Sequence, residues 1–172
     1  MVMGDDPDLR QHLVELLKGK GAHLAFDEVI SDWPAEARTR IPHGAPHSAW
    51  QLLEHMRIAQ RDILDFCVKP DYIEPRFPDD YWPPDDEAPD DAAWTTSVER
   101  FADDLKQMQH LVTDPKTDLR AKIPHGTGQT ILREALVVAD HNAYHVGQLV
   151  LLRGLLGIWP SHAAEFKDRL HK

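Results

Sequence analysis

The amino-acid sequence predicts an all-α protein, a four-helix bundle with a long proline- and aspartate-rich crossover between the second and third helices. Apolar residues recur at helical spacing in several long stretches, whereas no stretch shows the alternation expected of a β-strand. One segment dense in proline separates these stretches into two pairs. The chain has 172 residues, of which 42% are hydrophobic. This is enough to bury a sizeable core, so we expect one domain over residues 1–172.

The first helix is expected over Asp5 to Lys18, because its acidic start suits the positive end of the helix dipole. Gly19 and Gly21 weaken a helix and should kink or stop it there. A short helical pattern resumes over residues 25–32 and ends at Trp33-Pro34. The inward stripe of the first helix consists of Leu9, Leu13, Leu16 and Leu17.

A second long helix is expected from about Pro46 to Phe66. Its apolar residues recur every three or four positions and define one inward face, made of Leu52, Met56, Ala59 and Ile63. His55 stands in the same stripe, three residues after Leu52 and four before Ala59. We therefore expect the side chain of His55 to point into the core.

The segment from Lys69 to Asp91 has a different character, with six prolines and seven aspartates. Neither a helix nor a central strand tolerates so many prolines, because each proline lacks a backbone donor. Tyr72, Phe77, Tyr81 and Trp82 are scattered through the segment. These aromatic side chains indicate a crossover that packs against the body of the domain.

Two further long helices follow the crossover. The first is expected over Ala92 to Thr113, where spacings of four and three residues define one seam, made of Trp94, Val98, Phe101, Leu105, Met108 and Val112. The second is expected from about Gly128 to Arg153 and should close at Gly154 and Gly157. Its inner side carries Ile131, Ala135, Val138, His141, His145, Gln148 and Leu152. A short terminal helix is expected within residues 160–172.

Composition excludes several classes of function. The formal net charge is −10 with neutral histidines, and no basic patch of the kind that binds nucleic-acid phosphates is visible. The most apolar run, from Val146 to Trp159, contains Gln148 and Arg153 and is too short to span a bilayer. The single cysteine, Cys67, excludes an internal disulfide. Since the N-terminus also lacks the features of a secretory signal, we expect a cytoplasmic protein without a membrane or nucleic-acid partner.

The clearest candidate for a functional site lies in the helix expected over residues 128–153. His141 and His145 are four residues apart, and side chains at that spacing lie above one another on the same helix face. Two imidazoles placed in this way can reach one metal ion. The residue after His141 is Asn142, so the glutamate that serves metalloproteases as a general base is absent. A chelating pair needs further ligands, which must come from another helix.

His55 is the candidate for the third ligand, since helix bundles build metal sites from side chains on facing helices. Three histidines could hold one divalent ion and leave a position open for water or substrate, as in catalytic zinc sites. Nitrogen ligands also suit nickel, iron, copper and cobalt, so the donors leave the metal undecided. The alternative is that His55, His141 and His145 are ordinary core residues, and helical periodicity does not separate the two interpretations.

The sequence around these histidines resembles the DinB/YfiT-like superfamily. The similarity rests on the run from Leu52 to His55 followed by Arg57-Ile58-Ala59, and on the later run from Asp140 to Gln148. It extends over most of the chain and includes the Asp-Tyr-Trp-Pro part of the crossover. The resemblance implies a bundle in up-down-down-up order. It also implies a divalent metal, zinc or nickel with iron as a further option, whose ligands correspond to His55, His141 and His145.

Three functions are compatible with such a site. Characterised members of the superfamily include thiol-dependent transferases and isomerases that use low-molecular-weight thiols such as bacillithiol and mycothiol. The leading expectation is therefore a metal-dependent enzyme that activates a small thiol towards a small electrophile. The alternatives are a non-catalytic metal-binding or stress-response dimer, and a metal-dependent hydrolase. Members are often homodimers, and the regular seam over residues 92–113 suits either a core or a dimer interface.

Other polar residues near the expected site are candidates for supporting roles. Gln148, one turn beyond His145, is placed to orient a ligand or a water. Asp62, two turns after His55, is the best-placed acid for proton transfer or for supporting a ligand. Three histidines in loops or at helix starts are expected to be exposed or to cap helices, with a place at the mouth of the site as the alternative: His43, His47 and His125. Solvated or inter-helix roles are expected for Glu54 and Asp140. An aromatic packing role is expected for Tyr144, with a hydrogen bond near the metal as the alternative.

Overall fold

The computed structural model describes residues 7–84 and 88–159, so the short helix expected within residues 160–172 lies outside the described part of the chain. The described residues form five α-helices and no β-strand, which confirms the prediction of an all-α protein. The helices are α1 (Pro7–Lys18), α2 (Phe26–Ile30), α3 (Ala49–Val68), α4 (Asp91–Thr113) and α5 (Ile131–Leu156). Two short 3₁₀ turns, η1 (Ala35–Ala37) and η2 (Asp79–Tyr81), lie in the connections.

Local sequence explains where the first long helices begin and end. α1 stops at Lys18 because Gly19 adopts a φ of 64°, a left-handed conformation that glycine accepts without strain. α3 begins after Ser48, whose hydroxyl accepts the Gln51 N–H at 3.2 Å. The Gln51 side chain in turn accepts the Ser48 N–H at 2.9 Å. This reciprocal cap sets the start of the helix that carries His55.

The predicted boundaries of the last long helix need correction. Gly128 has a φ of 136°, which lies outside the helical range, so α5 begins only after Thr130. The predicted closure at Gly154 is also wrong, because that residue lies inside α5. The residue that ends the helix is Gly157, with a left-handed φ of 69°.

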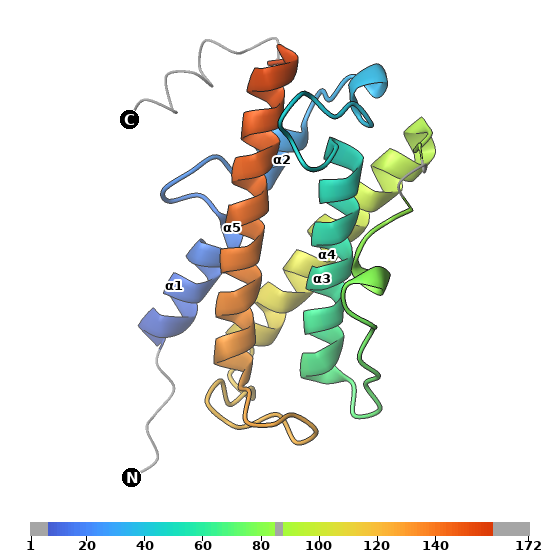
Figure 1. Cartoon of the computed structure of the whole chain (residues 1–172). Coiled ribbons are helices and arrows are strands. Elements are labelled where there is room, and N and C mark those ends of the chain that lie inside the picture. The colour runs from blue at the N-terminus through green and yellow to red at the C-terminus, as the bar shows by residue number, and fades with distance from the viewer. Residues whose placement is uncertain (1–6, 85–87, 160–172) are drawn as a thin grey trace.

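α3 lies beside both α4 and α5, and α1 also contacts these two helices (Figure 1). Buried apolar side chains fill the contacts, with Phe101 and Leu149 in one cluster and Leu17 and Met108 in another. One expectation fails on α1: Leu16 is 53% exposed, whereas Val14 is buried. Leu13 and Leu17 of the predicted stripe are buried, so the buried face of α1 includes Val14 in place of Leu16. No helix in the described part of the chain is long and apolar enough to cross a membrane.

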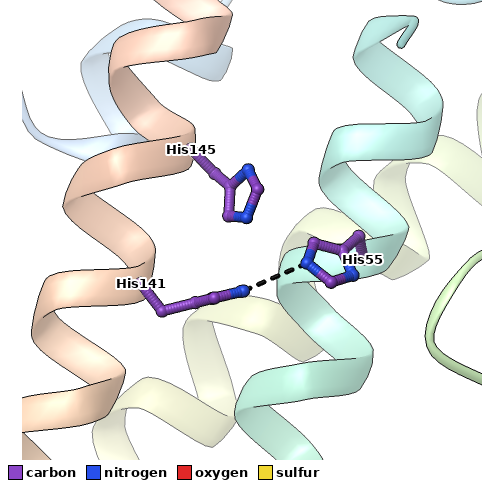
Figure 2. A group of neighbouring side chains, drawn as sticks. All are labelled: His55, His141 and His145. Atoms are coloured by element: carbon purple, nitrogen blue, oxygen red, sulfur yellow. Dashed lines mark hydrogen bonds between the residues drawn. The ribbon is translucent and has the colours of Figure 1, made fainter. Parts of the chain in front are cut away.

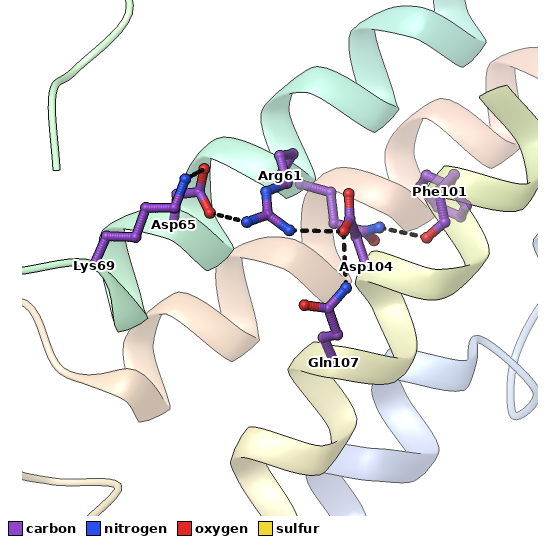
Figure 3. A network of polar contacts seen from close by, with 7 residues as sticks. Arg61, Asp65, Lys69, Phe101, Asp104 and Gln107 are labelled. Carbon is purple, nitrogen blue, oxygen red and sulfur yellow. Dashed lines mark hydrogen bonds and ion pairs between the residues drawn. The ribbon is translucent and has the colours of Figure 1, made fainter. Parts of the chain in front are cut away.

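A network of polar side chains joins α3 to α4 (Figure 3). Arg61 donates to Asp65 on its own helix and to Asp104 on α4, with a distance of 3.1 Å to Asp104 Oδ1. Lys69 reaches the other oxygen of Asp65 at 2.7 Å, and Gln107 donates to Asp104 at 3.2 Å. The buried carboxylate of Asp104 therefore has two donors, which offsets the cost of removing its charge from water.

The crossover segment, residues 69–90 between α3 and α4, runs back along α3 in its described part, and η2 contacts that helix (Figure 1). Tyr72, Tyr81 and Trp82 are partly buried, in line with the expected packing. Phe77 does not pack against the domain as expected, since this residue is 81% exposed. The segment thus brings two tyrosines and one tryptophan to the face of α3 that carries His55.

Candidate metal centre

His55 on α3 faces His141 and His145 on α5, and the three imidazoles point into the space between the two helices (Figure 2). One ring nitrogen from each residue lies within 4.8 Å of the other two. The Nε2 atoms of His141 and His55 are 3.1 Å apart. The His145 ring centroid is 4.5 Å from that of His141 and 4.8 Å from that of His55. The structure therefore brings together all three residues that the sequence singled out.

A chain of buried amides sets the register of the helices around this cluster. The Asn142 side chain on α5 donates to Gln60 Oε1 on α3 at 2.8 Å, and Gln60 donates to the Phe101 carbonyl on α4 at 2.7 Å. Both amides are buried, so each hydrogen bond is costly to lose. The sequence interpretation missed these two residues. The available signal was a polar residue, Asn142, placed between the two histidines of the chelating pair.

Hydrogen bonds to the Nδ1 atoms of His55 and His145 determine which ring nitrogen carries the proton. His55 Nδ1 lies 2.9 Å from the backbone carbonyl of Tyr81, which can only accept, so Nδ1 carries the proton. His145 Nδ1 lies 2.6 Å from the side-chain oxygen of Gln148, with the same consequence. In each ring the Nε2 atom keeps a lone pair for a ligand role. This is how proteins commonly orient histidine ligands of metals.

Electrostatics favour the neutral form of all three imidazoles. Burial, followed by the nearby His145 and His55, lowers the pKa of His141 to about 4. Burial is also the main reason that the pKa values of His55 and His145 lie below their ordinary value. Neutral imidazole is the form that coordinates a metal. Three neutral nitrogen donors at this spacing fit a divalent transition-metal ion or zinc.

Trp82 covers one side of the cluster. Its ring stacks on His55 with centroids 4.0 Å apart, and on His47 with centroids 4.1 Å apart. His47 is close enough to His55 and His145 to affect the pKa of both. The structure therefore places His47 at the mouth of the site, which was the alternative left open by the sequence.

The other two loop histidines lie elsewhere. His43 is exposed in the loop before α3. His125 is hydrogen-bonded to the Phe66 carbonyl at 2.9 Å, near the end of α3. Each of these two histidines belongs to a four-residue Ile-Pro-His-Gly run, at residues 41–44 and 123–126. The two runs differ in conformation, since Gly44 has a φ of 86° while Gly126 stays outside the left-handed region. Of the three loop histidines, only His47 is thus brought to the cluster.

Asp62 is hydrogen-bonded to two tyrosines. Its Oδ1 accepts the Tyr72 hydroxyl at 2.7 Å, and its Oδ2 accepts the Tyr81 hydroxyl at 2.6 Å. Both tyrosines belong to the crossover segment. Asp62 therefore anchors the crossover segment to α3 through both carboxylate oxygens, while its expected role in proton transfer stays a prediction.

The remaining candidates are Glu54, Asp140 and Tyr144, of which Glu54 has the expected inter-helix role and Asp140 the expected solvated one. Glu54 is buried and accepts two hydrogen bonds from Arg57, at 2.8 and 2.7 Å. Burial opposes ionisation of Glu54, yet hydrogen bonds from Arg57 and from Ser97 on α4 keep its pKa below the ordinary value. Asp140 is exposed. Tyr144 is 66% exposed and presents its ring edge-on to His145, with centroids 5.0 Å apart.

Comparison with known families identifies the chain. A family model described as the DinB superfamily matches residues 22–149, a range that contains all three histidines of the cluster. Comparisons with curated proteins and with solved structures found no match. Because the family match covers well over half of the sequence, the chain belongs to the DinB superfamily.

Proposed function

We propose that this DinB-superfamily protein is a divalent-metal enzyme, a thiol-dependent S-transferase or isomerase. The observation that carries the proposal is the cluster of His55, His141 and His145, with ring nitrogens within 4.8 Å of one another. A divalent ion bound there would act as a Lewis acid that lowers the pKa of a small thiol and favours attack by the thiolate on an electrophile. The three imidazoles would hold the ion, and Tyr81 and Gln148 would orient two of them.

The raised pKa of the protein's own thiol, Cys67, favours an external thiol as the nucleophile. Cys67 is partly buried, and burial, followed by the charge of Glu134, raises its pKa to about 12. A thiol with so high a pKa stays protonated at neutral pH and is a poor nucleophile. The reactive sulfur would therefore come from a low-molecular-weight thiol.

Zinc or nickel is the proposed ion, with iron as the next candidate, because three imidazole nitrogens suit ions of borderline softness. The donor set contains neither a thiolate nor a carboxylate among the described residues. This composition disfavours magnesium and calcium, which prefer oxygen ligands.

The finer expectations from the sequence belong to the same proposal. They are an up-down-down-up four-helix bundle, a homodimer, a cytoplasmic location, and a small thiol and small electrophile as partners. The packing of α3 against α4 and α5 supports the bundle. The net charge of −10 supports small-molecule partners over a nucleic acid.

Elemental analysis of the purified protein tests the metal site. We expect about one divalent ion per chain, lost in the variants His55→Ala, His141→Ala and His145→Ala. The matched control is His110→Ala, on the exposed side of α4, which should keep the metal. If His55→Ala kept the ion while His141→Ala and His145→Ala lost it, His55 on α3 would not be the third ligand. His47 would then be the next candidate. Full retention in all three variants would mean that the histidines are ordinary core residues.

An activity assay separates the proposed chemistry from its alternatives. The metal-loaded protein is incubated with a chromogenic aryl halide or an ester, with and without added low-molecular-weight thiols. Consumption of the aryl halide only when thiol is present supports the thiol-dependent enzyme. Ester hydrolysis without thiol would favour a metal-dependent hydrolase. Inactivity in every combination would favour a non-catalytic metal-binding or stress-response dimer.

A further inference from the structure

We propose that Asp62 is a positioning residue for the histidine cluster and that it acts on His55 through Tyr81 of the crossover segment. The inference rests on the metal-binding function proposed above. Two hydrogen bonds carry it. Asp62 Oδ2 accepts the Tyr81 hydroxyl at 2.6 Å, and the backbone carbonyl of Tyr81 accepts the Nδ1–H of His55 at 2.9 Å.

The geometry follows from the spacing on α3. Asp62 comes seven residues after His55, and residues that are seven apart lie on the same face of a helix, two turns from each other. Tyr81 bridges this separation, because its phenol reaches Asp62 while its carbonyl reaches His55. A single residue of the crossover segment thus contacts α3 at two levels.

The carboxylate is itself held in place. Its second oxygen accepts the Tyr72 hydroxyl at 2.7 Å, so Asp62 receives two charge-assisted hydrogen bonds from the crossover segment. Burial, and then the bond to Asp62, raises the pKa of both phenols, which keeps them protonated as donors. Asp62 therefore holds the crossover segment against α3 through Tyr72 and Tyr81. Tyr81 is also the residue whose carbonyl contacts His55.

The consequence for His55 is a fixed ring. The Tyr81 carbonyl lies at its Nδ1 edge, and the next residue, Trp82, stacks on its face with planes 3° from parallel. Both contacts come from the crossover segment. Because the carbonyl requires the Nδ1–H tautomer, the Nε2 lone pair of His55 points towards His141, 3.1 Å away. If the crossover segment moved away from α3, the His55 ring would lose both the hydrogen bond that fixes its tautomer and the stacked ring that fixes its orientation.

Two phenol-to-phenyl variants test the inference. Tyr81→Phe and Tyr72→Phe each remove one hydrogen bond to Asp62, but only Tyr81 carries the carbonyl that contacts His55. Tyr72 packs instead against Phe66 and His125. In a Co²⁺ titration followed by visible absorption, we expect Tyr81→Phe to bind about tenfold more weakly than the parent, as for other partners of metal-bound histidines. Tyr72→Phe should stay within about twofold, and Asp62→Asn should lose less affinity than Asp62→Ala, because the amide oxygen still accepts a phenol.

A second measurement determines the tautomer of the His55 imidazole in the metal-free protein. Nitrogen-15 correlation spectra of the His55 imidazole should show the Nδ1–H tautomer in the parent and in Tyr72→Phe, and a mixture of tautomers in Tyr81→Phe. An unchanged tautomer and unchanged Co²⁺ affinity in Tyr81→Phe would overturn the inference, as would equal losses in both tyrosine variants. If the parent bound no Co²⁺, the proposed metal function would fail. The tautomer spectra would then decide by themselves whether Asp62 and Tyr81 position His55.

Discussion

The ring of Trp82 lies flat on the imidazole of His55, with centroids 4.0 Å apart and planes 3° from parallel. Trp82 belongs to the crossover segment and His55 to α3, so the segment forms one wall of the candidate site. Burial is the largest cause of the lowered pKa of His55, ahead of the opposing hydrogen bond to Tyr81. The stacked ring contributes to that burial because it keeps water from one face of the imidazole.

Removing the indole should therefore raise the pKa of His55. We expect Trp82→Ala to move the pKa upward towards the ordinary value of 6.5, since hydration stabilises the charged imidazolium. A proton NMR titration of the histidine ring signals in metal-free protein measures the change, with the parent protein as the reference. An unchanged His55 titration would show that Trp82 does not control its hydration.

Gln148 should contribute to metal affinity through His145. Its side-chain oxygen lies 2.6 Å from His145 Nδ1, so Gln148→Leu removes the group that holds the ring and its tautomer. We expect about tenfold weaker Zn²⁺ binding by calorimetry. The control is Gln11→Leu, at an exposed position on α1. Equal affinities in the two variants would contradict an orienting role for Gln148.

The lowered pKa of His141 predicts a pH dependence of stability in metal-free protein. The imidazole titrates near 6.5 in the unfolded chain but at about 4 in the folded protein. Between these values the unfolded state binds a proton that the folded state does not, so falling pH favours unfolding. The contribution is fully present above pH 6.5 and is lost progressively towards pH 4.

A substitution isolates this contribution from that of the other titrating groups. In the presence of a chelator, His141→Asn should lose less stability than the parent between pH 7 and pH 5, with a difference of about 1 kcal/mol after allowing for partial exposure. Urea unfolding at the two pH values measures it. Equal losses in both proteins would mean that His141 is protonated as readily in the fold as in the unfolded chain.

The polar network between α3 and α4 should matter for stability at neutral pH. Asp104→Ala removes the acceptor of Arg61 and Gln107, and we expect the free energy of unfolding to fall by about 1–2 kcal/mol. The adjacent Asp103→Ala is the control, because its carboxylate is 66% exposed and pairs with the equally exposed Lys106 on the surface of α4. That change should stay within about 0.5 kcal/mol. Similar urea midpoints for both variants would contradict the network's contribution.

Arg153 is expected to be among the most sensitive positions in the fold. It is fully buried and donates to the carbonyls of Val29, Ser31 and Ile158, while its guanidinium lies 4.6 Å from the centre of the Trp33 ring. Arg153→Met leaves these carbonyls without their donor and should lower the free energy of unfolding by about 3 kcal/mol.

The matched control for Arg153 is Arg120→Met, at an exposed position before α5. Its effect should lie within about 0.5 kcal/mol, because surface changes away from special contacts are nearly neutral. Thermal unfolding followed by circular dichroism compares the two proteins. A small effect of Arg153→Met would show that water replaces the lost donors.

Local sequence determined the helical class of this protein and part of its site. The four-residue spacing of His141 and His145 places them on one helix face, because the helical repeat depends only on neighbouring residues. The same local chemistry ended α1 at Gly19 and began α3 after Ser48. The inward direction of His55 also followed from periodicity, since it shares a stripe with Leu52 and Ala59.

Only the tertiary structure decided which of these side chains meet. It placed His55 against His141, joined Gln60 to Asn142, and bound Asp62 to tyrosines of the crossover segment. It also left Leu16 exposed on a face that periodicity had assigned to the core. Periodicity specifies the faces of each helix, but it does not specify how the helices rotate and cross. Those angles result from packing between segments that are far apart in the chain, and they determine which faces become the core and which residues form the site.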